Sequence, residues 1–116
     1  MKVAFHFGKY RVAMVSVDSG YEALRDILED NRSADACDRL VAQAEECACE
    51  RSSWKMSFNS CHLIIQGNRV YLESEWDESS VDMKLSSFIA LIRQWRCFMS
   101  DEKKLKFMEC DIDLLG

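Results

Sequence analysis

The chain has 116 residues, of which 48% are hydrophobic and 30% charged, and its formal net charge is −5. This length suffices for one domain with its own hydrophobic core, so we expect a single domain over residues 1–116. An acidic chain is repelled by phosphate backbones and by anionic lipid surfaces, which argues against direct binding to nucleic acid or membrane and favours a basic partner.

The sequence also carries signals of location. Residues 1–8 combine a lysine with alternating aromatic residues and lack the pattern of a secretory leader, and no apolar run reaches 18 residues. We therefore expect a cytoplasmic protein. Thiols stay reduced in that compartment, where free cysteine behaves as a small apolar residue. The six cysteines expected to be free are Cys37, Cys47, Cys49, Cys61, Cys97 and Cys110.

Residues 3–17 predict a β-hairpin. Val3, Phe5 and Phe7 alternate with other residues, and β-branched and aromatic residues return between 10 and 17. Gly8 is expected to begin a two-residue turn, because the first position of a type II′ turn requires positive φ.

Two helices are predicted next. Ser19 and Glu22 have the spacing of a capping box, and the first helix should run to about Asn31. Ser33 is the expected N-cap of the second helix, which should end near Glu50. The residues expected to face inward recur at helical spacing: Tyr21, Leu24, Ile27, Leu28, Leu40, Val41, Ala44 and Cys47.

The second half returns to alternation. Residues 54–76 predict a three-stranded antiparallel meander with a tight turn at Gly67-Asn68, and the acidic connection 77–80 follows it. Apolar residues then recur at helical spacing: Leu85, Phe88, Ile89, Ile92, Trp95 and Met99. Residues 108–114 alternate again and allow one more strand. The predicted fold class is α+β, with a mainly antiparallel sheet and about three helices.

The most distinctive segment is the predicted strand 69–78. Glu73 and Glu75 should share one face with Tyr71, while Val70, Leu72 and Trp76 share the other. We interpret the acidic face as a surface for a basic partner. The expected contact residues are Glu73, Glu75, Trp76, Asp77, Glu78 and Asp82, with Glu109, Asp111 and Asp113 as a second group. An ordinary solvated face is the main alternative.

Catalytic and metal-binding alternatives find little support in the spacing. Cys47 and Cys49 lack the spacing of a structural zinc pair, and His62 should point away from its neighbour Cys61. Glu73 and Glu75 project about 7 Å apart on one side of a strand, but any exposed strand has this geometry. We expect no catalytic residue, metal or cofactor, and therefore a binding protein and not an enzyme.

The three tryptophans differ in their expected roles. Trp54 and Trp95 lie on apolar periodicities and should pack in the core. Trp76 ends a strand beside carboxylates, which is typical of an exposed anchor for a partner.

Three stretches carry a resemblance to known families: Glu50-Arg-Ser-Ser-Trp54, the turn from Gln66 to Val70, and the helix from Ser87 to Phe98. Over about residues 50–99 the chain resembles the small YacL-like bacterial family and the immunity proteins of bacterial contact-dependent growth inhibition systems. The first half and the tail after Ser100 depart from that pattern.

The immunity resemblance implies a non-enzymatic protein that binds and neutralises the C-terminal toxin domain of a cognate effector, commonly a basic nuclease. It transfers no contact residue, because toxin and immunity surfaces diversify in pairs. The YacL-like resemblance implies a cytosolic interaction domain of unknown ligand.

Overall fold

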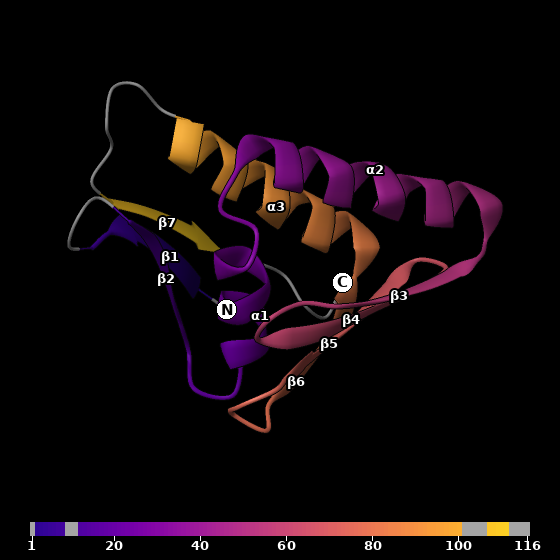
Figure 1. Cartoon of the computed structure of the whole chain (residues 1–116), viewed down its shortest axis with the longest axis horizontal. Helices are drawn as coiled ribbons and strands as arrows, with labels where there is room; N and C mark the ends of the chain where they lie inside the picture. Colours follow the sequence, from indigo (N-terminus) through magenta and orange to yellow (C-terminus); the bar gives the residue numbers. More distant parts are fainter. Residues whose placement is uncertain (1, 9–11, 101–106, 112–116) are drawn as a thin grey trace.

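The computed structural model describes residues 2–8 and 12–100 of the chain, together with the backbone of 107–111 (Figure 1). The elements, in order, are β1 (Lys2–Phe7), β2 (Ala13–Val17), α1 (Glu22–Glu29), α2 (Ala34–Glu50), β3 (Ser53–Ser57), β4 (Cys61–Gln66), β5 (Arg69–Ser74), β6 (Ser80–Lys84), α3 (Leu85–Ser100) and β7 (Phe107–Asp111). All strand pairings among the described residues are antiparallel. The fold is therefore α+β, as predicted.

The strands form two sheets with the orders β2-β1-β7 and β3-β4-β5-β6. The predicted last strand is β7, which pairs with β1; residues 112–116 lie outside the described part. The prediction of a three-stranded meander was incomplete, because β6 pairs with β5 as a fourth strand. Val81 and Met83 of β6 are buried and alternate with exposed residues, so β5 is an inner strand.

The two predicted tight turns had different outcomes. The first was wrong: Phe7 pairs with Ala13, and the Gly8 N–H donates to the Val12 carbonyl at 2.8 Å, which makes a longer connection. Gly8 does not have positive φ. The turn at Gly67-Asn68 is confirmed, since the flanking residues pair directly and Gly67 has φ +59°.

The start of α1 differs from the predicted capping box. The helix begins at Glu22, and no side chain of the preceding residues caps it. The Glu22 carboxylate accepts the Gly20 N–H at 3.1 Å, and hydrogen bonds from the Glu22 and Gly20 backbone lower the pKa of Glu22. The Ala23 N–H instead donates to Ser79 Oγ at 3.1 Å, from a distant part of the chain. This replaces the local cap that Ser19 was expected to supply.

The second helix has the predicted cap. Ser33 Oγ accepts the Ala36 N–H at 3.1 Å, and α2 ends at Glu50 as expected. Arg51 then adopts the left-handed conformation with φ +54°, which lets the Ser52 N–H reach the Cys47 carbonyl at 3.1 Å. Such closures usually contain glycine, because a side chain in this conformation is strained.

Replacing Arg51 by glycine should therefore stabilise the fold by about 0.5–1 kcal/mol, since it relieves the left-handed conformation at an exposed helix end. The free energy of unfolding measured in urea tests this. Ser52→Gly is the control: its φ is not positive, so the same substitution one residue later should destabilise. Destabilisation by Arg51→Gly would contradict the prediction.

The helices cover one face of the four-stranded sheet. α1 also contacts β2 of the other sheet, while α2 and α3 lie side by side along the top of Figure 1. α3 buries more than the predicted stripe: Leu91 and Phe98 are buried, whereas Ile89 and Met99 are only half-buried. The outer face of this sheet carries alternate residues of each strand that are mostly exposed or half-buried.

An aromatic cluster joins α3 to the first sheet. Trp95 is fully buried as predicted, and its ring lies 5.1 Å from that of Phe5 in an edge-to-face arrangement. Its Nε1–H donates to the Asn31 carbonyl at 3.0 Å, so the helix connection is fixed to the same cluster.

Candidate functional site

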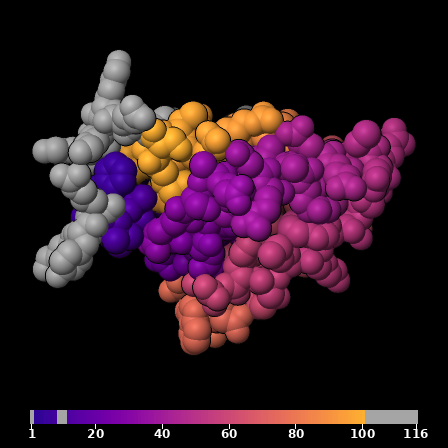
Figure 2. Space-filling view, turned by 45° about the horizontal axis from the view of Figure 1, so that its top comes forward, coloured from indigo at the N-terminus to yellow at the C-terminus, as the bar shows by residue number. Residues whose placement is uncertain are grey.

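The loop between β5 and β6, residues 75–79, protrudes from the body of the molecule at the bottom of Figures 1 and 2. We call it the Trp76 loop. Its tryptophan is 76% exposed, the largest value among the exposed large hydrophobic side chains of the described part. The prediction that Trp76 shares the inward face of Leu72 was wrong, because β5 ends at Ser74. The prediction that Trp76 is an exposed side chain is confirmed.

A hydrogen-bonded network attaches the Trp76 loop to α1. The buried Asp26 carboxylate accepts Ser74 Oγ at 2.6 Å and Arg25 Nη2 at 2.9 Å. Arg25 Nη2 also donates to Asp77 Oδ2 at 2.5 Å, and the Asp77 N–H donates to Ser74 Oγ at 3.2 Å. Burial alone would lower the pKa of Arg25, but the bonds to Asp26 and Asp77 raise it. Asp77, an expected partner contact, is thus paired within the protein, although its side chain stays 38% exposed.

Ser79 supplies a second attachment. Its Oγ accepts the Ala23 N–H of α1, and its carbonyl accepts the Ser74 N–H at 2.8 Å. Both ends of the Trp76 loop are therefore held, and the exposed Trp76 projects from a fixed frame. Glu78 in the same loop has φ +51°, a conformation that costs a non-glycine residue free energy and is often retained at binding sites.

The remaining expected contacts divide into paired and unpaired acids. Glu75 Oε2 lies 2.5 Å from His62 Nε2, and Asp82 Oδ1 lies 2.6 Å from Arg69 Nη2. Glu73 and Glu78 have no ion pair or side-chain hydrogen bond within the described part of the chain. They are therefore the acids available to a partner.

The second expected group is not on this surface. Glu109 and Asp111 belong to β7, where their backbones pair with Ala4 and Lys2 in the other sheet. Asp113 lies outside the described residues.

The outer sheet face is not uniformly acidic, as the alternation had suggested. Lys55, Arg69 and Lys84 lie on it together with Glu73 and Asp82, because the register places Arg69 opposite Lys84 and Tyr71 opposite Asp82. Negative charge gathers at one end, around a hollow of about 350 Å³. Its lining residues are His62, Glu73, Ser74, Glu75, Glu78, Ser79 and Ser80.

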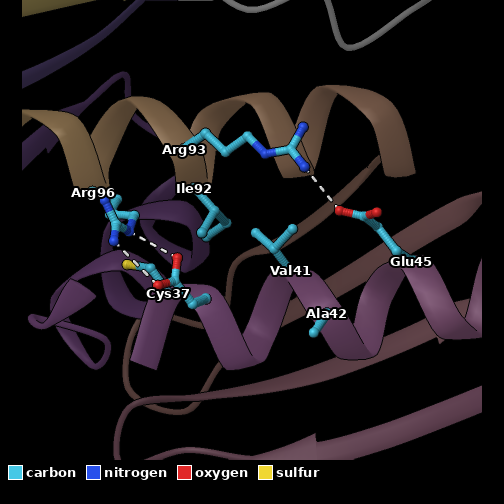
Figure 3. A pocket seen from close by; sticks show the side chains of 8 residues that line it. Cys37, Val41, Ala42, Glu45, Ile92, Arg93 and Arg96 are labelled. Atoms are coloured by element: carbon cyan, nitrogen blue, oxygen red, sulfur yellow. Dashed lines mark hydrogen bonds and ion pairs between the residues drawn. The ribbon is translucent and has the colours of Figure 1, made fainter. Parts of the chain in front are cut away.

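A larger hollow of about 450 Å³ lies between α2 and α3 (Figure 3). Arg96 and Asp38 cross it at 2.7 Å and Arg93 and Glu45 at 2.8 Å, so the two helices are antiparallel and their charges neutralise each other. Hydrogen bonding to Asp38 raises the pKa of Arg96. These pairings leave the hollow without a free charge to recognise a ligand.

A third hollow, of about 400 Å³, lies between α2 and β3 and is largely apolar. Trp54 forms part of its wall and is half-buried, so this side chain packs less completely than predicted. In the described part of the chain, no three His, Cys, Asp or Glu side chains are grouped to hold a metal ion, and no helix could span a membrane.

The five cysteines with described side chains are free thiols, but they differ in burial. Burial raises the pKa of Cys37 to about 11, and burial together with Asp30 raises that of Cys61 to about 12. Cys49 and Cys97 are exposed.

Iodoacetamide at pH 8 should therefore alkylate Cys49 and Cys97 first, because the thiolate is the nucleophile and these thiols are accessible. Cys37 and Cys61 should react only after unfolding in urea. Peptide mass spectrometry at timed intervals measures both rates. Equal rates for Cys61 and Cys97 in the folded protein would show that the buried thiols are not protected.

Comparisons of the chain with protein-family models, with curated proteins and with solved structures found no match.

Proposed function

We propose that this protein is a binding protein that neutralises a basic protein partner, the toxin domain of a contact-dependent growth inhibition effector. The observation that carries the proposal is Trp76, exposed at the end of a loop that is attached to α1 at both sides. An exposed tryptophan on a fixed frame is typical of an interface anchor, since it buries a large area at low cost in conformational entropy.

The charge around Trp76 favours a basic partner. Glu73 and Glu78 line the hollow beside the loop without internal partners, so their carboxylates can meet lysine or arginine side chains. A nuclease presents such side chains to phosphate, and an acidic inhibitor is attracted by the same field. The resemblance to immunity proteins agrees with this chemistry.

Binding to the basic toxin domain encoded beside this gene tests the proposal. The double variant Glu73→Gln/Glu78→Gln should slow association and weaken binding, with the loss decreasing as salt is added. Surface plasmon resonance at several salt concentrations gives both rate constants. The variant retains the ion pairs of Asp77 with Arg25 and of Asp82 with Arg69.

The matched control is Glu46→Gln/Glu50→Gln on α2, which removes the same charge from exposed positions of another surface. This control should change the association rate constant only as far as the lower net negative charge of the whole protein does. If both double variants bind alike, the Trp76 loop is not the contact surface; if the toxin domain does not bind the native chain, the immunity function is wrong.

A further inference from the structure

Three polar side chains form a hydrogen-bonded row across three strands. Ser57 Oγ of β3 lies 2.9 Å from His62 Nδ1 of β4, and His62 Nε2 lies 2.5 Å from Glu75 Oε2 just after β5. His62 and Glu75 are 43% and 46% exposed, so the row is accessible from solvent. We call it the Ser57 row. Ser57 is neither one of the expected partner contacts nor a residue of the core.

The carboxylate determines the hydrogen-bond roles in the Ser57 row. Glu75 can only accept when ionised, so it selects the His62 tautomer with the proton on Nε2. Nδ1 then carries the lone pair and accepts the hydroxyl proton of Ser57. A hydroxyl bonded to a basic imidazole, which is in turn oriented by a carboxylate, is the arrangement of an activated serine nucleophile.

The sheet register explains this geometry. The Phe58 N–H donates to the Cys61 carbonyl and the Gly67 N–H to the Ser52 carbonyl, so Ser57 and His62 form the intervening pair without mutual backbone bonds. Side chains approach most closely in such pairs. Because β3 is an edge strand, the Ser57 N–H points away from β4 towards the open edge, where it can donate to an oxyanion formed at Ser57.

We propose that Ser57 is a nucleophile for acyl transfer from carboxylic esters. Ser57 Oγ attacks the carbonyl carbon while its proton passes to His62 Nδ1; the ester C–O bond then breaks, and His62 returns the proton to the departing alcohol. Water, deprotonated by His62, releases the acid and restores Ser57. Glu75 is a positioning residue for His62. This activity goes beyond the partner binding proposed above and departs from the expectation that the chain is not an enzyme.

Two hollows meet at His62 and define the substrate class. One, of about 200 Å³, is lined by Lys55, Met56, Ser57, His62, Leu63 and Ile64 and suits a short apolar acyl group. The other is the acidic hollow that contains Glu73, Glu75 and Glu78, which favours a positively charged alcohol. The expected substrate is thus an ester of a short acid with a cationic alcohol.

Labelling with a fluorophosphonate probe tests the nucleophile, because Ser57 Oγ would form a bond to phosphorus and fluoride would leave. Peptide mass spectrometry should find one adduct, on Ser57, and about 100-fold slower labelling in His62→Gln. Ser53→Ala is the matched control on the same face of β3 and should label like the native chain. An unlabelled Ser57, or labelling that His62→Gln leaves unchanged, would overturn the proposal.

The role of Glu75 has its own spectroscopic test. ¹⁵N chemical shifts of the His62 ring should report the Nε2-protonated tautomer in the native chain and lose that preference in Glu75→Gln, with His6 as the unchanged internal reference. Labelling should slow in the same variant. An unchanged tautomer would remove Glu75 from the mechanism.

The substrate class is tested with acetylcholine and its uncharged carbon analogue, neohexyl acetate, by following acetate release with NMR. The cationic ester should react several-fold faster, and Glu78→Gln should reduce the ratio of the cationic to the neutral rate. Equal rates for the two esters in the native chain would overturn the assigned substrate class. Ser57→Ala should abolish turnover of both and leave partner binding intact, which separates this activity from the function proposed above.

Discussion

Replacing Trp95 by alanine is expected to lower the free energy of unfolding by about 4 kcal/mol, near the upper end of core truncations. Its side chain is fully buried against Phe5 and Phe98, with ring centroids 5.1 and 6.2 Å away. The substitution leaves a large cavity where α3 meets the first sheet, and it removes the donor to the Asn31 carbonyl. Urea denaturation monitored by circular dichroism measures the loss.

Trp95→Phe separates packing from hydrogen bonding. It retains most of the aromatic volume but removes the Nε1–H donor, and the Asn31 carbonyl keeps the weak donor Cys37 Sγ at 3.5 Å, so it should cost about 1 kcal/mol. A loss below about 1 kcal/mol for Trp95→Ala would mean that this cluster does not form the centre of the core. Since domains of this size have about 5–15 kcal/mol of stability, the alanine variant should also unfold at a clearly lower temperature.

The second large effect is expected at Trp76, in binding and not in stability. Trp76→Ala should change the free energy of unfolding by less than about 0.5 kcal/mol, because the side chain is 76% exposed. It should weaken binding of the proposed basic partner at least about 30-fold, the loss expected for a central aromatic anchor. Calorimetric binding and urea denaturation of the same preparation test both parts.

Tyr71→Ala is the comparison for this prediction. Tyr71 is an exposed aromatic residue on the outer face of β5, away from the Trp76 loop, and its loss should have little effect on the partner. If Trp76→Ala and Tyr71→Ala bind with native affinity, the loop does not anchor the partner. If Trp76→Ala unfolds at lower urea, Trp76 supports the fold instead.

Periodicity predicted much of the fold because each element repeats its own spacing over several residues. Trp95 and Leu40 recur with apolar neighbours at helical spacing, Leu63 lies in a short apolar run, and Val70 and Leu72 alternate with Arg69, Tyr71 and Glu73. β6 was missed since only Val81 and Met83 mark its inward face before α3 begins at Leu85 without a break. A strand this short, joined directly to a helix, has too few alternating residues to be distinguished from a loop by its sequence.

The site was harder to predict for a different reason. Sequence pattern identified Trp76 and its neighbouring acids, but their availability depends on partners far along the chain. Asp77 pairs with Arg25, 52 residues away, and Glu75 with His62. Only tertiary structure brings such groups together. One local signal could have been used: Asp26 interrupts the inward side of α1 between apolar residues, which is typical of a buried acid with a partner.

The bond from Ala23 to Ser79 makes the start of α1 dependent on a loop 56 residues later in the sequence. Opening that loop would leave the first turn of the helix without an acceptor, so the two segments should open as one cooperative unit. Their amide hydrogens should then exchange with similar protection. A partner bound at Trp76 would stabilise the loop and so slow hydrogen exchange at the Ala23 amide, which it does not contact. Exchange at the start of α1 would therefore measure whether a partner is bound to the loop.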